Sequence, residues 1–123
     1  MRDHTKLKAF HEADTLAVLV YRLTRSFPAE ERYGLTSQMR RAAVSIPSNI
    51  VEGCARSTET EYLRFLDIAF GSLRELQYQA SLAHRVGCCD EKTFRELDDQ
   101  ATACSKLLAG LIRALRPQQP NSR

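Results

Sequence analysis

The residue types that most often catalyse reactions or hold metals are few in this sequence. Its three histidines are His4, His11 and His84, and none of them has a carboxylate three residues before it. A di-metal carboxylate site inside a helical bundle needs such Glu-x-x-His pairs. We therefore expect no metal centre and no other cofactor.

The four cysteines, at positions 54, 88, 89 and 104, have neither a CxxC spacing nor a histidine at zinc-ligand spacing. Cys104 falls on an apolar stripe of helical spacing, where a cysteine usually behaves as a small buried hydrophobe. We expect all four thiols to be structural and reduced.

One group of possible nucleophiles surrounds a proline. Ser45, Ser48 and Cys54 lie near Pro47, and a serine with a neighbouring base can be activated. No histidine is close in the sequence, and there is no glycine-bounded nucleophile elbow, phosphate-binding glycine loop or dinucleotide fingerprint. These side chains are therefore predicted to satisfy backbone groups freed by the proline, and the chain is predicted not to be an enzyme.

Arginine accounts for 14 of the 18 basic residues, and the net charge is +3. The guanidinium group suits phosphate recognition, although a GC-rich genome would produce the same excess. Nearby glutamates, such as Glu30 and Glu59, would offset the positive charge, and no aromatic platform for stacking unpaired bases is evident. The candidate nucleic-acid-binding residues are Arg22, Arg25, Arg40, Arg41, Arg56 and Arg64.

The elements that would position these residues are helices, because apolar residues recur at spacings of three and four. Four helices are expected, and the first, third and fourth cover residues 7–26, 58–86 and 90–116. The second begins between residues 28 and 36 and ends near residue 56. A capping box at Thr58, an N-cap at Asp90 and a left-handed Gly87 mark boundaries. Short connections between long helices predict an all-α, up-down-up-down antiparallel four-helix bundle over 1–116, with a flexible polar tail over 117–123.

Two features of these helices concern packing. Residues 16–21, LAVLVY, are apolar around the whole circumference, whereas a helix in a monomeric bundle needs only one apolar side. This pattern predicts that copies of the chain associate. In the third helix, Gly71 is expected to let a neighbouring helix approach closely.

The second helix places a polar line beside its apolar stripe. Pro47 has no N–H for the carbonyl of Ala43, so the helix is expected to kink there. The polar line is either a solvated face or a set of hydrogen bonds between helices or subunits, with Arg41 or Arg56 pairing Glu52. The candidate motif and interface residues are Ser45, Ile46, Pro47, Asn49, Ile50, Glu52 and Gly53.

No segment is typical of a membrane or secreted protein. The sequence lacks an apolar stretch near the ~18 residues that a bilayer span requires, and its N-terminus lacks the pattern of a signal peptide. The expected location is the cytoplasm.

Residues 35–56, LTSQMRRAAVSIPSNIVEGCAR, resemble the signature of the four-helix bundle proteins encoded within intervening sequences of bacterial 23S ribosomal RNA genes. VYRLTRSFPAEERYG upstream and EYLRFLDIAFGSLRELQYQASLA downstream extend the resemblance to about residues 5–115. Cys54 and the pair Cys88-Cys89 depart from the family pattern outside its core, SIPSNI.

The resemblance implies a closed bundle that assembles as a ring, typically a homopentamer, with no established enzymatic activity. A related group comprises accessory proteins of diversity-generating retroelements, which bind nucleic acid and a reverse transcriptase. The first functional hypothesis is thus a homo-oligomer that binds RNA or DNA. The alternative is an assembly scaffold whose ligand is another protein.

Overall fold

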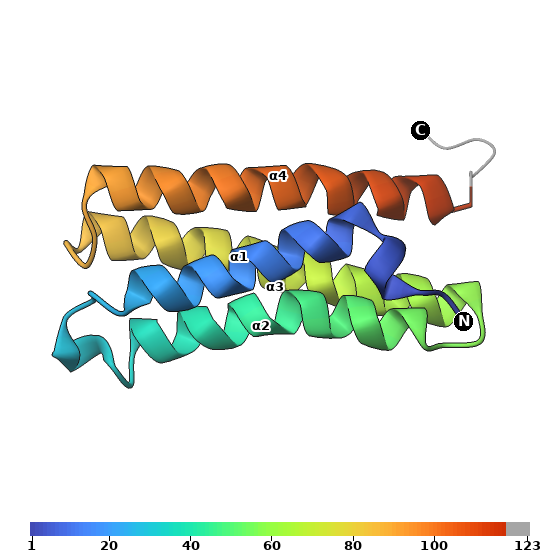
Figure 1. Ribbon diagram of the computed structural model, residues 1–123, viewed down its shortest axis with the longest axis horizontal. Helices are drawn as coiled ribbons and strands as arrows, with labels where there is room; N and C mark the ends of the chain where they lie inside the picture. The colour runs from blue at the N-terminus through green and yellow to red at the C-terminus, as the bar shows by residue number, and fades with distance from the viewer. Residues whose placement is uncertain (118–123) are drawn as a thin grey trace.

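The computed structural model describes residues 1–117, and within them all regular structure is helical. Four long helices lie side by side in Figure 1, with short 3-10 turns at His4–Lys6 and Ala29–Glu31. The long helices are α1 (Lys8–Thr24), α2 (Leu35–Cys54), α3 (Glu59–Arg85) and α4 (Glu91–Leu115). The prediction of an all-α chain with four helices is confirmed. Of the predicted tail, residues 118–123 lie outside the described part.

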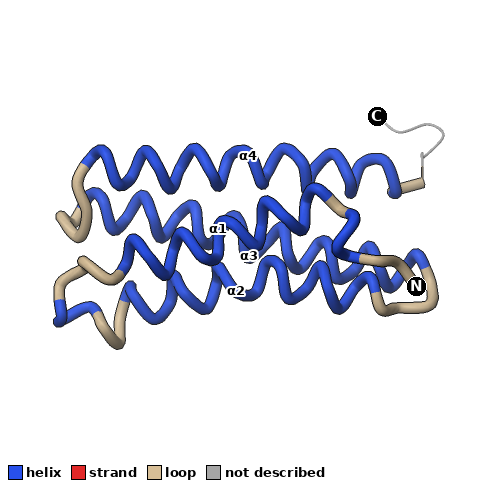
Figure 2. The backbone as a smooth tube through the Cα atoms, in the orientation of Figure 1, coloured by secondary structure: helices blue, strands red, loops and turns tan. Residues whose placement is uncertain are grey.

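Short connections join the helices at both ends of the bundle (Figure 2). α1 packs against α2 and α4, and α3 packs against the same two helices. None of the described helices combines the length and apolar character that crossing a bilayer would require.

The helix boundaries follow from local hydrogen bonds. The Thr58 hydroxyl accepts a hydrogen bond from the backbone N–H of Glu61 at 3.2 Å, and the Asp90 carboxylate accepts one from Thr93 at 2.8 Å. Gly87 has a φ of 86°, as expected of a residue that ends a helix in the left-handed region. Asp90 and Gly87 are thus confirmed as boundary residues. Of the capping box predicted at Thr58, the structure shows the bond to the Thr58 hydroxyl, whereas the Glu61 carboxylate pairs with Arg64 at 3.1 Å.

The core lies along the shared axis of the four helices and is apolar. On α4, the residues of the predicted stripe from Leu97 to Leu108 are buried, including Cys104 with 0% exposure. Each large side chain buried in this way stabilises the fold by about 1.5–3 kcal/mol. The largest fully buried aliphatic residues are Leu16, Val20, Met39, Ile46, Ile50, Leu66, Leu73, Leu76 and Leu108.

The close approach between α2 and α3 occurs at Gly53. A Cβ atom there would lie 2.9 Å from the Cβ of Phe65 and 3.3 Å from the carbonyl oxygen of Tyr62. The expectation that Gly71 fills this role is wrong, because a Cβ at Gly71 would meet no atom within 4 Å. The helix periodicity placed both glycines on helices but did not identify which one faces a neighbouring backbone.

The N-terminal residues are anchored across the α2–α3 turn. The backbone N–H of Arg2 donates to the carbonyl of Cys54 at 2.7 Å, which satisfies one of the free carbonyls at the end of α2. The Arg2 guanidinium lies 4.1 Å from the centre of the Tyr62 ring and pairs with Glu59 at 3.4 Å. Cys54 and Tyr62, which lie at this turn, are each 1% exposed.

Candidate subunit and nucleic-acid interfaces

The polar residues of the second-helix motif bond mainly within the subunit. The hydroxyl of Ser45 lies 2.9 Å from that of Ser72 and so links α2 to α3. The Asn49 amide donates to the carbonyl of Ser45 at 2.8 Å and to its hydroxyl at 3.0 Å. Glu52 is exposed and pairs with Arg56 at 3.5 Å, one helical turn away. Ser45 and Asn49 therefore serve helix packing, whereas Glu52 belongs to the surface.

The apolar residues of the motif face two directions. Ile46 and Ile50 are fully buried in the core. Pro47 is buried beside a shallow hollow between α1 and α2, which Phe10 and Ala17 also line. Gly53 is buried against α3, as described above. The motif therefore determines how α2 contacts both of its neighbours.

Four apolar side chains remain exposed along α1 and α2. Val18 and Tyr21 keep 59% and 43% of their surface exposed, and Val44 and Val51 keep 41% and 36%. They line two adjoining hollows that share Ala17. We call these four residues the α1–α2 apolar face. Helix α1 thus has one side in the core and further apolar side chains at the surface, as its composition predicts.

Four of the six candidate arginines are engaged within the chain. Arg22 pairs with Glu96 at 3.4 Å, linking α1 to α4, and Arg64 pairs with Glu61 at 3.1 Å. Arg56 pairs with Glu52, as noted above. Arg40 donates from Nε to the hydroxyl of Thr24 at 2.9 Å and from Nη2 to the carbonyl of Tyr21 at 3.2 Å. Their charges are therefore partly offset, or their donors used, by neighbouring groups.

The other two arginines, Arg25 and Arg41, are exposed and have no ion-pair partner within residues 1–117. Arg25 follows the end of α1, whereas Arg41 borders a polar hollow between α2 and α3. At the opposite end of α2, Arg56 and Arg64 both lie over the ring of Phe65, at 4.8 Å and 4.6 Å. The six arginines therefore do not form a single patch on one subunit.

The four cysteine thiols are held in their protonated form. Burial raises the pKa of Cys54, Cys88 and Cys89, and raises that of Cys104 to about 12. An activated nucleophile would require the opposite shift. Over residues 1–117, no three or more histidine, cysteine, aspartate or glutamate side chains cluster in a way that could hold a metal ion.

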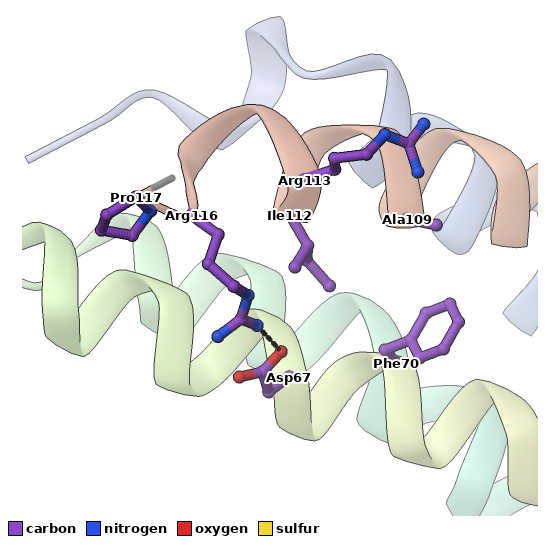
Figure 3. Close-up of a pocket in the computed structure, with 7 residues that line it drawn as sticks. All are labelled: Asp67, Phe70, Ala109, Ile112, Arg113, Arg116 and Pro117. Carbon is purple, nitrogen blue, oxygen red and sulfur yellow. Dashed lines mark hydrogen bonds and ion pairs between the residues drawn. The ribbon is translucent and has the colours of Figure 1, made fainter. Parts of the chain in front are cut away.

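Sequence reasoning missed a hollow between α3 and α4. Figure 3 shows Arg116 reaching from the end of α4 to Asp67 on α3, where Nη2 and Oδ1 are 2.8 Å apart. Phe70 and Ile112 line the hollow beside this ion pair. The only sequence signal for it was the pair Arg113 and Arg116 at the end of the apolar stripe of α4.

The chain is similar to proteins whose function is not known. One solved structure, described as a protein of unknown function from the S23 ribosomal protein family of Bacteroides thetaiotaomicron VPI-5482, superposes with a TM-score of 0.79 at 22% identity. The superposition covers 85% of this chain and 95% of that one, and it shows a shared fold. No curated protein matches the chain. The sequence model of the family described as 23S rRNA-intervening sequence protein matches residues 5–110, and the chain therefore belongs to that family.

Proposed function

We propose that this protein is a non-catalytic, homo-oligomeric helical bundle of the cytoplasm, and that five copies form the assembly. Within each copy we infer antiparallel up-down-up-down order, which the alternating course of the colours in Figure 1 supports. We also infer a bend in α2 at Pro47, because proline has no N–H to donate to the carbonyl of Ala43. The number five comes from the family resemblance.

The observation that carries the proposal is the α1–α2 apolar face. Its residues are spaced at three and seven along their helices, so each pair lies on one side of its helix. Covering the exposed part of Val18 in a contact would contribute on the order of 1 kcal/mol, and the other three side chains would add comparable amounts. A ring repeats this contact at every junction.

Light scattering coupled to size-exclusion chromatography tests the assembly. A pentamer of the 13.9 kDa chain has a mass of about 70 kDa, which is five times the chain mass. Val18→Asp would place a charge in the contact and is expected to release smaller species with unchanged helix content. Val86→Asp is the matched control, because Val86 is also a valine with 59% exposure but follows α3.

Wild-type protein that elutes as a compact single subunit at micromolar concentration would contradict the proposal. So would a Val18→Asp variant with the same mass as the wild type.

RNA or DNA binding is the second part of the proposal, and Arg25 and Arg41 are the residues that favour it. Their guanidinium groups are exposed and free of ion pairs in the described part of the chain. A ring would repeat both positions around its axis and enlarge the local positive potential. The four engaged arginines would contribute less, because their partners would have to be displaced.

Binding to a labelled 23S rRNA fragment can be followed by fluorescence anisotropy between about 50 and 200 mM salt. Affinity should fall steeply with salt, because phosphate contacts release counterions. Combined Arg25→Gln and Arg41→Gln should weaken binding and flatten the salt dependence. Arg22→Gln is the control, because Arg22 is already paired with Glu96.

Absent or salt-insensitive binding would leave the alternative, an assembly scaffold that recognises another protein. That alternative predicts a specific protein partner. It also predicts that the purified protein has a 260/280 nm absorbance ratio no higher than that of protein free of nucleic acid.

A further inference from the structure

The hollow between α3 and α4 is open to solvent and has an apolar lining with charged groups beside it. Its volume is about 450 Å³, within the range of roughly 300–1,000 Å³ typical of ligand pockets. Phe70 and Ile112 are half-buried and provide its apolar part, with Ala109 and Pro117 beside them. In Figure 3 the side chain of Ile112 points from α4 towards α3, where Phe70 is located. This hollow lies on the opposite pair of helices from the α1–α2 apolar face.

The charge around this hollow is unbalanced. Arg116 and Asp67 form an ion pair that closes one end. Arg113 also lines the hollow and has no ion-pair partner within residues 1–117. The guanidinium carbon of Arg74 lies 5.3 Å from the centre of the Phe70 ring. Arg74 stands outside the lining of the hollow and donates to Gln77 at 3.1 Å. The lining itself therefore holds two guanidinium groups, of Arg113 and Arg116, and one carboxylate, of Asp67, around an apolar surface.

We propose that this hollow binds a small anion with an apolar body, such as a medium-chain aliphatic or an aromatic carboxylate. The carboxylate accepts hydrogen bonds from Arg113 at the rim, and Arg116 contributes positive charge while it stays paired with Asp67. Hydrogen bonds between a guanidinium group and a carboxylate are roughly twice as strong as neutral ones. The apolar body covers Phe70 and Ile112, which would otherwise contact water.

The chain contains no tryptophan, so Phe70→Trp would introduce a single tryptophan into the hollow, whose emission can be separated from that of the four tyrosines. Octanoate is the probe, and octylammonium, which has the same chain length and the opposite charge, is the control ligand. We expect a saturable change in emission with octanoate and an affinity for octylammonium at least about tenfold lower. Arg113→Gln in the same background should weaken octanoate binding by about tenfold, as expected for the loss of a charge-assisted hydrogen bond.

Arg25→Gln is the matched control variant, because Arg25 is also exposed and has no ion pair within residues 1–117 but follows α1. It should leave octanoate affinity unchanged. If Phe70→Trp lowers the helix content, calorimetric titration of octanoate into the wild type and into Arg113→Gln replaces the fluorescence measurement.

Three results would overturn the proposal. These are equal affinity for octanoate and octylammonium, no saturation below about 10 mM octanoate, and unchanged affinity in Arg113→Gln. A hollow already filled by a second copy would give no saturable signal, and this too counts against it. Oligomer mass is measured on the same samples, so failure of the ligand site is distinguished from failure of the assembly.

Discussion

Substituting two glycines by alanine should change stability in opposite directions. In Gly53→Ala the new Cβ would lie 2.9 Å from the Cβ of Phe65, whereas carbon atoms in contact normally lie about 3.5–4.0 Å apart. Neither that Cβ nor the carbonyl oxygen of Tyr62 at 3.3 Å can move by rotating a side chain, so α2 and α3 must separate. Overpacking of this kind costs about 1–3 kcal/mol, and the better helix propensity of alanine offsets about 1 kcal/mol. The expected net loss is therefore about 1 kcal/mol and at most about 2 kcal/mol.

Gly71→Ala is the matched control, because it also lies inside a helix but its new Cβ meets no atom within 4 Å. Its free energy of unfolding should rise by about 0.5–1 kcal/mol, because alanine has the better helix propensity. Urea unfolding followed by circular dichroism at one fixed protein concentration measures both, since association also contributes to stability. The packing described at Gly53 would be refuted if the Gly53→Ala variant were as stable as the wild type. It would also be refuted if the Gly71→Ala variant were less stable than the wild type.

Three further predictions concern the same fold. Ser45→Ala should lower the free energy of unfolding in urea by about 1–2 kcal/mol, because the half-buried Ser72 and Asn49 each lose a hydrogen-bond partner. Ser48 is exposed, so Ser48→Ala should change the same free energy by less than about 0.5 kcal/mol. Thr58→Ala should lower the free energy of unfolding by about 1 kcal/mol through loss of the α3 cap. Burial raises the pKa of Cys104 from 9.0 to about 12 and that of Tyr62 from 10.0 to about 12, so the folded chain retains protons that the unfolded chain releases. Stability should therefore be full below pH 9 and decline as the pH rises to 12, and Cys104→Ala should make this decline shallower.

Features of the fold that depend on local sequence were predictable, because each has a local physical cause. The capping hydroxyl of Thr58 and the positive φ of Gly87 follow from residue type and position. Burial of Cys104 follows from its place on the apolar stripe of α4. The exposed Val18 on α1 was implied by a helix that is apolar on every side.

Features that depend on which helices become neighbours were not predictable from one sequence. Periodicity puts Gly53 and Gly71 on helices, but only the packing of α2 on α3 decides that a backbone passes Gly53. The pairing of Asp67 with Arg116 joins residues 49 positions apart. The engagement of Arg40 with Thr24 likewise depends on the contact between α1 and α2. A count of arginines could not reveal how many of them already form ion pairs or hydrogen bonds within the chain.

The second-helix motif combines an unusual set of residue types because each one meets a different neighbour. Ile46 fills the core, Ser45 bonds to α3, Pro47 borders the hollow shared with α1, and Gly53 admits the backbone of α3. An ordinary amphipathic helix needs one apolar stripe and tolerates most polar residues elsewhere. Here three sides of α2 are constrained at once, and a larger residue at Gly53 or an apolar one at Ser45 would disturb a specific contact. The motif therefore determines how α2 packs against its neighbours, and its variants should alter the free energy of unfolding.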